Sequence, residues 1–276
     1  MDKIIDGKEI QNILKEEYKN KINLIKDKLK LVVIQVGDDP ASSVYVRNKG
    51  KICEEVGICF EHKKFDFISE DDLISLIESL NDDKDVNGIL VQLPLPDGMN
   101  ADKIINKISP LKDVDGLTTS NIGKLFAGEK GLVPCTALGV MKCLDYANVS
   151  LEGANVAIVG RSKLVGLPLI SLLLKRNASV NVYHSKTVDL KEKTSMADVL
   201  IVAVGRANLI KEDFVKDGAV VIDVGINRAF GKLCGDCDYS SLYDKVSYIT
   251  PVPGGVGQLT VVMLVNNVIE AYNLQK

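Results

Sequence analysis

Short runs of valine and isoleucine recur along this chain and alternate with longer stretches of helical spacing. In the second half the runs show no apolar–polar alternation, which is typical of strands buried on both faces of a parallel sheet. The strands expected there are 155–159, 179–183, 198–204, 219–224 and 247–250. This repeated order of strand and helix predicts an α/β fold with mainly parallel strands.

The first half of the chain carries the same pattern. A leading helix is expected near 8–28, followed by strands at 30–36, 58–65 and 88–93 with helices at 42–56 and 71–80 between them. The Gly- and Pro-containing stretch 110–140 then connects this unit to the second one. Two successive α/β units predict two α/β domains that flank a cleft, and such clefts are preferred ligand sites.

The expected boundaries place one α/β domain at 1–137 and a second, Rossmann-like domain at 138–260. A last helix carries apolar residues at positions 261, 264, 265, 268 and 272, which fall on one helical face. We expect this helix, 261–276, to pack back on the first domain.

Composition excludes several classes of function. The 276 residues carry a net charge of −3 and no lysine-rich tail, so no nucleic-acid partner is expected. The longest apolar runs, such as 199–204, are far too short to cross a membrane, and no membrane partner is expected. The first residues lack the apolar core of a signal peptide, which favours a cytoplasmic protein.

Cysteine spacing gives no strong indication of a metal site. Only Cys234 and Cys237 have CxxC spacing, and a zinc site would need a second pair of ligands. The only histidines are His62 and His184. We therefore interpret the cysteines, including Cys53 and Cys59, as ordinary thiols and expect no metal.

A glycine turn follows the strand expected at 155–159. Gly160 ends the strand, Gly166 lies six residues later, and a helix is expected to start near Leu164. This order aims backbone N–H groups and a helix N-terminus at a ligand phosphate. The spacing departs from GxGxxG, since Ser162 replaces the middle glycine and the last glycine comes one residue late.

The end of the next strand bears on the choice of cofactor. NAD sites usually place a carboxylate there for the ribose 2′-hydroxyl, whereas this strand ends in Val182-Tyr-His184-Ser185-Lys186. Arg161, Ser162 and Ser185 could instead surround a 2′-phosphate, with His184 or Lys186 adding positive charge. NADP is therefore favoured over NAD, and solvated loop charges are the alternative reading.

Two further expected strands end in glycine, at Gly205 and at Gly225, which precedes Ile226. The carboxyl ends of parallel strands face the ligand crevice, where glycine lets a cofactor approach the backbone closely. Plain turn glycines are the alternative. The shared placement favours a cofactor site.

Ser42, Tyr45 and Lys49 share one face of the helix expected at 42–56. The spacing alone is common on protein surfaces. Other motifs accompany it: Val91-Gln92-Leu93-Pro94, Lys112-Asp-Val-Asp115-Gly116 and Pro251-Val-Pro-Gly-Gly-Val-Gly-Gln258-Leu-Thr260. Together with the glycine turn and His184-Ser-Lys-Thr187, they closely resemble the bifunctional methylenetetrahydrofolate dehydrogenase/methenyltetrahydrofolate cyclohydrolase family, in order from Ser42 to Thr260.

The resemblance implies two reactions of one-carbon metabolism, which also serve purine biosynthesis. A hydride passes from 5,10-methylenetetrahydrofolate to NADP⁺, and water then converts the methenyl product to 10-formyltetrahydrofolate. Hydride transfer needs no protein acid or base, so the protein contributes alignment. Hydration needs proton transfer, for which enzymes use positioned side chains such as lysine. The resemblance also implies a homodimer.

The resemblance further implies roles for individual residues. Lys49 is central to the cyclohydrolase step, Gln92 positions it, Tyr45 stacks against the folate, and Asp115 accepts hydrogen bonds from the pterin. The implied substrate contacts are Ser42, Val91, Leu93, Pro251, Val252, Pro253, Gly254, Gly255, Gly257 and Thr260. The implied cofactor contacts are Gly160, Arg161, Ser162, Gly166, His184, Ser185, Gly205, Gly225 and Ile226.

Three positions depart from the family pattern. Gln258 and Ala137 stand where the family usually has proline, and Cys237 replaces a common valine. The first change falls in the expected substrate loop and could alter its stiffness. None of the three removes an expected catalytic side chain.

Two alternatives remain at this point. Another NAD(P)-dependent dehydrogenase, acting on an amino acid or a shikimate-like acid, would explain 155–225 but leave Gln92 and Asp115 without a role. A binding protein that kept the fold and lost the chemistry would not need Lys49.

Overall fold

The computed structural model describes residues 3–229 and 231–276 and divides the chain into two compact units. The three-strand unit comprises Ile13–Cys135 and Val261–Lys276, and the five-strand unit comprises Met1–Asn12 and Thr136–Thr260. The division falls within α1 (Gly7–Asn23) and α10 (Val256–Gln275).

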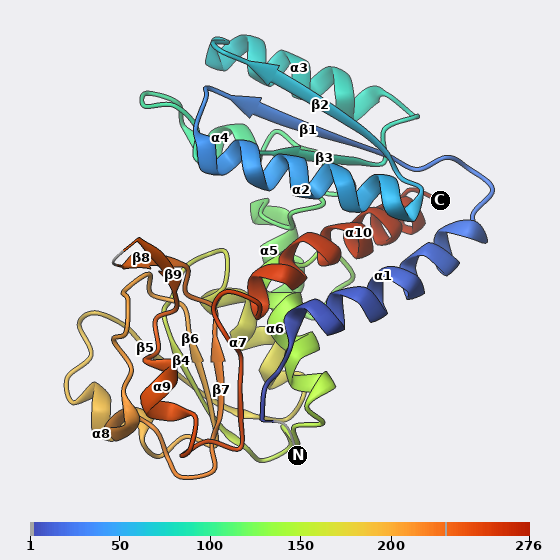
Figure 1. The fold of residues 1–276 in the computed structure, drawn as a ribbon. Helices are drawn as coiled ribbons and strands as arrows, with labels where there is room; N and C mark the ends of the chain where they lie inside the picture. The colour runs from blue at the N-terminus through green and yellow to red at the C-terminus, as the bar shows by residue number, and fades with distance from the viewer. Residues whose placement is uncertain (1–2, 230) are drawn as a thin grey trace. The chain divides into compact units, whose positions relative to one another are not determined.

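The three-strand unit is built on a parallel sheet of order β2-β1-β3. Its strands are β1 (Lys30–Val36), β2 (Cys59–Phe65) and β3 (Gly88–Val91). The helices α2 (Pro40–Val56) and α3 (Glu70–Asp82) lie on opposite faces of this sheet (Figure 1). Val32 and Ile34 of β1 pack with Leu73 and Ile77 of α3 in a core that excludes water. Successive residues of β1 are buried on both faces, as the valine- and isoleucine-rich run predicts.

Capping residues define where the helices of this unit begin and end. The Asp39 carboxylate accepts the Ser42 N–H at the start of α2, Pro40 occupies its first turn, and Gly57 ends it at a φ of 93°. Two shorter helices follow, α4 (Ala101–Ile105) and α5 (Thr119–Ala127). The Thr118 hydroxyl caps α5 by accepting the Asn121 N–H.

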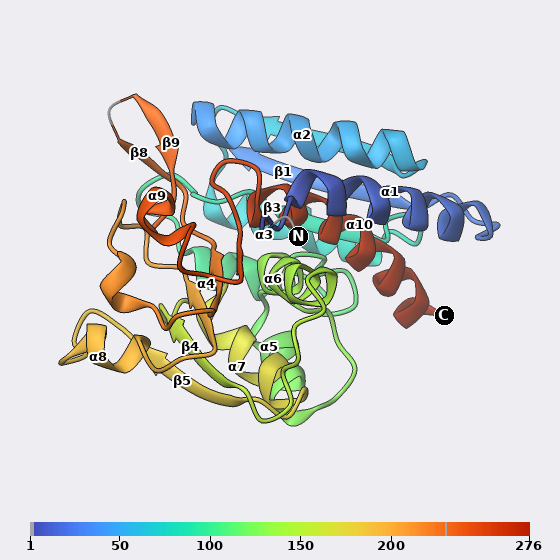
Figure 2. The same cartoon turned by 60° about the horizontal axis from the view of Figure 1, so that its bottom comes forward.

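The five-strand unit contains a parallel sheet of order β10-β7-β6-β4-β5. Its strands are β4 (Asn155–Val159), β5 (Ser179–Tyr183), β6 (Val199–Val202), β7 (Val220–Asp223) and β10 (Tyr248–Ile249). Its helices are α6 (Cys135–Tyr146), α7 (Gly166–Leu174), α8 (Leu190–Thr194), the 3₁₀ turn η1 (Glu212–Phe214) and α9 (Tyr239–Leu242). A separate antiparallel hairpin joins β8 (Asn227–Ala229) to β9 (Lys232–Cys234) (Figure 2).

The predicted α/β class with mainly parallel sheets is confirmed. Strands β1, β4 and β5 have the expected bounds, whereas β6 is shorter than the expected 198–204. The leading helix ends at Asn23 rather than near Lys28. The chain turns there, and the N–H groups of Leu24 and Ile25 donate to the carbonyls of Lys21 and Ile22. The stretch 110–140 is not a plain connection, since it contains α5 and the start of α6.

Among residues 3–229 and 231–276, no helix has both the length and the apolar character needed to cross a membrane.

Candidate functional site

A lysine and a glutamine from neighbouring elements meet in the three-strand unit. Lys49 lies on α2 with 9% of its surface exposed, and its Nζ donates to Gln92 Oε1 at 2.9 Å. Gln92 directly follows β3, and its Nε2 donates to the Leu93 carbonyl at 2.7 Å. The amide is therefore held with its oxygen toward the ammonium, so the pair places a buried positive charge at a defined point.

Ser42 and Tyr45, two other expected site residues, lie near this pair. The side chain of a third expected residue, Val91, is buried in the core. The Ser42 hydroxyl donates to the same Leu93 carbonyl at 3.3 Å, which ties the start of α2 to the segment after β3. Tyr45, one helical turn before Lys49, is 37% exposed, so its ring is available for stacking. Val91 is 4% exposed and packs in the core with Ile34, so only its backbone could contact a substrate.

The position of these residues follows from the order of the sheet. Strand β2 is added on one side of β1 and strand β3 on the other side. The direction in which strands are added to the sheet therefore reverses between β1 and β3. Ligands of open parallel sheets bind at the carboxyl ends of the strands at such a reversal. Both Gln92 and α2, which carries Lys49, follow the carboxyl ends of these two strands.

Asp115 is held beside a buried thiol that our sequence analysis did not single out. Cys135 is 2% exposed, and its Sγ donates to the Val114 carbonyl at 3.4 Å. Burial raises the pKa of the Cys135 thiol, the Asp115 carboxylate raises it further, and the Lys49 ammonium opposes the shift. The thiol therefore stays protonated and serves as a hydrogen-bond donor rather than as a nucleophile.

The loop around Asp115 is fixed by polar groups on both sides. Asp113 is 1% exposed and accepts the N–H groups of Leu117 and Thr118 at 3.1 and 2.8 Å. From α10, Asn267 Nδ2 donates to the carbonyls of Val114 and Val133, both at 2.8 Å. Sequence reasoning missed Asn267, although a polar residue within an apolar helix is the signal that could have found it.

The glycine turn of the five-strand unit brings the start of α7 close to the end of β4. Gly160 has a φ of 127°, and a Cβ there would collide with the Ala203 carbonyl. A Cβ on Gly166 would collide with the Gly160 carbonyl, so α7 can start this close to β4 only with glycine. Helix α7 starts at Gly166 rather than near Leu164, after a turn in which Ser162 Oγ accepts the Val165 N–H at 3.2 Å.

The residues expected around a 2′-phosphate lie at the ends of β4 and β5. Arg161, Ser162 and Ser185 are exposed. The ring of His184 is engaged in a local turn, where its Nδ1 accepts the Lys186 N–H at 3.2 Å.

The glycines after β6 and β7 lie in different surroundings. Gly205 is exposed, with a φ of 65° that favours glycine. Gly225 is buried, and a Cβ there would collide with the carboxylate of Asp236, a residue that sequence reasoning missed. The close approach at Gly225 is therefore to the protein's own side chain. Ile226 beside it is 49% exposed.

The segment from Pro251 to Thr260 is anchored within the five-strand unit. The Gly254 carbonyl accepts the Gly7 N–H at 2.8 Å, and Gln258 N–H donates to the Gly255 carbonyl at 3.1 Å. Proline at position 258 would lack this N–H, so Gln258 adds a hydrogen bond at the start of α10. The hydroxyls of Thr136 and Thr260 are 3.3 Å apart.

The other two departures are buried in the same unit. Ala137 is 0% exposed in α6, and Cys237 is 3% exposed in the core under β6 and β7. Burial raises the pKa of the Cys237 thiol well above its ordinary value. Within the described residues, no three His, Cys, Asp or Glu side chains are grouped to hold a metal ion.

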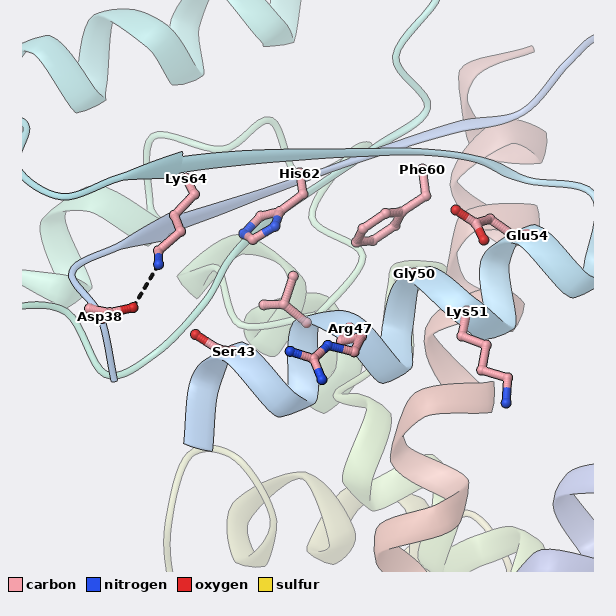
Figure 3. A pocket seen from close by; sticks show the side chains of 10 residues that line it. Asp38, Ser43, Arg47, Gly50, Lys51, Glu54, Phe60, His62 and Lys64 are labelled. Carbon is pink, nitrogen blue, oxygen red and sulfur yellow. Dashed lines mark hydrogen bonds and ion pairs between the residues drawn. The ribbon is translucent and has the colours of Figure 1, made fainter. Parts of the chain in front are cut away.

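A separate pocket of about 620 Å³ lies between another face of α2 and strand β2 (Figure 3). None of the expected site residues line it. Its basic residues Arg47, Lys51 and Lys64 are mixed with Asp38 and Glu54, and Lys64 donates to Asp38 at 2.6 Å. The charges that line the pocket are therefore mixed and favour neither an anionic nor a cationic ligand.

Known proteins match the chain over its whole length. The "Bifunctional protein FolD" of Agathobacter rectalis is 50% identical over 98% of this chain and 99% of its own. The bifunctional FolD enzyme of Campylobacter jejuni has a crystal structure that superposes with a TM-score of 0.95, at 47% identity and with 98% and 99% of the two chains covered. The Trypanosoma brucei enzyme, solved with NADP cofactor and inhibitor, has a TM-score of 0.93 at 31% identity, covering 99% and 97%.

Shikimate 5-dehydrogenase of Thermus thermophilus is similar only at the level of the fold, with 15% identity, a TM-score of 0.52, and 90% and 98% of the chains covered. Two family models match instead. The catalytic domain of tetrahydrofolate dehydrogenase/cyclohydrolase matches residues 5–115, and the NAD(P)-binding domain of the same family matches residues 134–276. The chain therefore belongs to the tetrahydrofolate dehydrogenase/cyclohydrolase family.

Proposed function

We propose that this chain oxidises 5,10-methylenetetrahydrofolate with NADP⁺ and hydrolyses the methenyl product to 10-formyltetrahydrofolate, with Lys49 central to the second step. Membership of the family supports both activities. The observation that carries the residue-level proposal is the buried pair of Lys49 and Gln92 at the reversal point of the three-strand sheet.

The oxidation requires alignment rather than acid–base chemistry. NADP⁺ would supply the hydride acceptor when bound, and the substrate nitrogen would stabilise the cation that remains. The exposed ring of Tyr45 offers a stacking surface, and the fixed loop around Asp115 offers a carboxylate to the pterin. Alignment of two bound molecules can contribute roughly 7–11 kcal/mol to catalysis.

The hydrolysis requires proton transfer near the former one-carbon bridge. Water must lose a proton as it adds to the methenyl carbon, and a ring nitrogen must gain one when the ring opens. Lys49 is a proton-transfer group held in place by Gln92, whose Oε1 accepts a hydrogen bond from its Nζ.

The glycine turn of the five-strand unit fits the cofactor. Only glycine allows the approach of Gly166 to Gly160, and α7 presents its N-terminus where β4 ends. Strand β4 lies between β5 and β6, so its carboxyl end is also a reversal point. We assign Arg161, Ser162 and Ser185 to the 2′-phosphate, which selects NADP over NAD.

The remaining assignments are also proposals. The three-strand unit would act as the folate-binding domain and the five-strand unit as the NADP-binding domain. The cleft expected between the domains stays a prediction. A homodimer follows from the family resemblance. A cytoplasmic location is consistent with six free cysteines.

One assay tests the proposed function. Purified protein with methylenetetrahydrofolate and NADP⁺ should produce NADPH, followed through its absorbance. Methenyltetrahydrofolate alone should be consumed without any cofactor. Absence of turnover with NADP⁺ and with NAD⁺ would overturn the assignment.

A further inference from the structure

The segment 235–237, directly after β9, carries a buried acid that holds the loop after β6. Asp236 is 0% exposed. Its carboxylate accepts the backbone N–H groups of Val204, Gly205 and Arg206 at 2.6, 3.1 and 2.7 Å. Successive N–H groups pointing to one centre normally bind an anion, and here the anion belongs to the chain itself. The N–H groups of this loop are therefore engaged by protein and are not donors for a ligand phosphate.

The same carboxylate also holds the segment after β7. Asp236 Oδ1 accepts Asn227 Nδ2 at 2.9 Å, and Gly225 lacks the Cβ that would displace the carboxylate. One side chain thus links 204–206 to 225–227. These segments contain Gly205, Gly225 and Ile226, the proposed cofactor contacts after β6 and β7.

A second buried carboxylate keeps Asp236 in place. Asp223, at the end of β7 and 4% exposed, accepts the N–H groups of Asp236 and Cys237 at 3.0 and 2.8 Å. It also accepts the Gly225 N–H at 2.9 Å. Asp236 therefore cannot shift without breaking contacts to β7, which makes it a rigid link rather than an adaptable one.

We propose that Asp236 is a positioning residue for the dinucleotide: it sets the conformation of the loops after β6 and β7 without touching the cofactor. This inference rests on the proposed function, because it takes those loops to contact NADP. Asp236→Asn keeps the size of the side chain but replaces one acceptor oxygen by an NH₂ donor. Because both oxygens accept backbone N–H groups, this donor must face an N–H donor of the backbone. The loops should then move, and the cofactor should bind less tightly.

The test compares D236N with D238N. Asp238 caps α9 by accepting the Ser241 N–H, a role that asparagine also fills, so D238N is the matched control. NADP⁺ binding is measured by calorimetry, and cyclohydrolase kcat and KM are measured without cofactor. We expect D236N to raise the Kd for NADP⁺ about tenfold or more, from the loss of charge-assisted bonds, with cyclohydrolase constants within about twofold of wild type.

Loss of cyclohydrolase activity in D236N would show that this variant does not fold. A milder variant then provides the test. N227A removes only one bond to Asp236 and should raise the Kd about threefold, again with cyclohydrolase activity retained. An unchanged NADP⁺ Kd in the folded variants, or an equal change in D238N, would overturn the inference. Failure of the wild type to bind NADP⁺ would instead overturn the proposed function.

Discussion

The Lys49–Gln92 pair of the three-strand unit and the Asp223–Asp236 cluster of the five-strand unit use buried polar residues in different ways. In the three-strand unit, buried or half-buried groups such as Lys49 and Gln92 bond to each other and leave reactive atoms at the sheet end. In the five-strand unit, the buried acids Asp223 and Asp236 bond almost entirely to backbone N–H groups. The first arrangement fits the proposed chemistry of side chains, and the second fits the proposed binding of a cofactor by backbone. Substitutions should therefore affect turnover in one unit and affinity or stability in the other.

The largest effect is expected at Lys49. Lys49→Met should lower cyclohydrolase turnover about 10³-fold, because it removes a proton-transfer group, while leaving measurable hydride transfer. Stopped assays of methenyltetrahydrofolate hydrolysis and of NADPH formation measure the two activities. Lys51→Met, an exposed position on the same helix, is the control. Equal loss of both activities would contradict the division of roles.

The next effect concerns the pH dependence of stability through Asp223. Burial raises the pKa of this carboxyl from 3.8 to about 6, and the neighbouring Asp236 adds to the increase. Because the pKa is raised in the folded state, the contribution of Asp223 to the free energy of unfolding is fully present below about pH 3.8. This contribution is lost as the pH rises through about 6. The full change corresponds to about 3 kcal/mol.

Urea unfolding of wild type and Asp223→Asn measures this contribution. The stability of the wild type minus that of the variant should fall between about pH 4 and pH 6. A difference that rises over this range would show that Asp223 is more acidic in the folded state, and a constant difference would show that its pKa does not change on folding.

Gly225→Ala tests whether backbone is fitted tightly around the buried acids. The new Cβ would meet the Asp236 carboxyl group, so we expect a loss of about 1–3 kcal/mol in the free energy of unfolding. Gly123→Ala in α5 is the control, because no atom lies within 4 Å of its added Cβ. That change should stabilise the protein by up to about 1 kcal/mol. Similar melting temperatures for the two variants would remove the contrast.

The smallest effect is expected for an exposed charge of the five-strand unit. Arg161→Ala should weaken NADP⁺ binding about tenfold and leave NAD⁺ binding nearly unchanged, since only NADP⁺ carries the 2′-phosphate. Arg176→Ala, near the end of α7 and paired with Asp145, is the control. Calorimetric titration with both dinucleotides decides whether Arg161 is a ligand or a solvated charge.

The sequence predicted the features that depend on local pattern. Valine- and isoleucine-rich runs predicted β1 and β4, because buried parallel strands need such residues on both faces. Strand β5 has the expected bounds, but the expectation that it is buried on both faces is wrong: β5 lies at the edge of the sheet, and none of its residues is buried. The hairpin of β8 and β9 was missed, since its three-residue strands are too short to show any period.

At the candidate site, the family motifs indicated Lys49, Gln92 and Asp115 but not the residues that hold them. The bonds of Asp236 to the loop after β6 join positions about thirty residues apart. No spacing rule links a single aspartate to the backbone N–H groups of a distant loop. Such partners can be recognised only when the fold is known.

The bonds from Asn267 to the carbonyls of Val114 and Val133 have a consequence for biosynthesis. The loop that carries Asp115 is completed by a residue of α10. A ribosome-bound chain whose helix α10 is still in the exit tunnel would therefore lack part of the support for the proposed folate site. We expect this site to mature only after α10 has left the tunnel, whatever the order in which the strands fold.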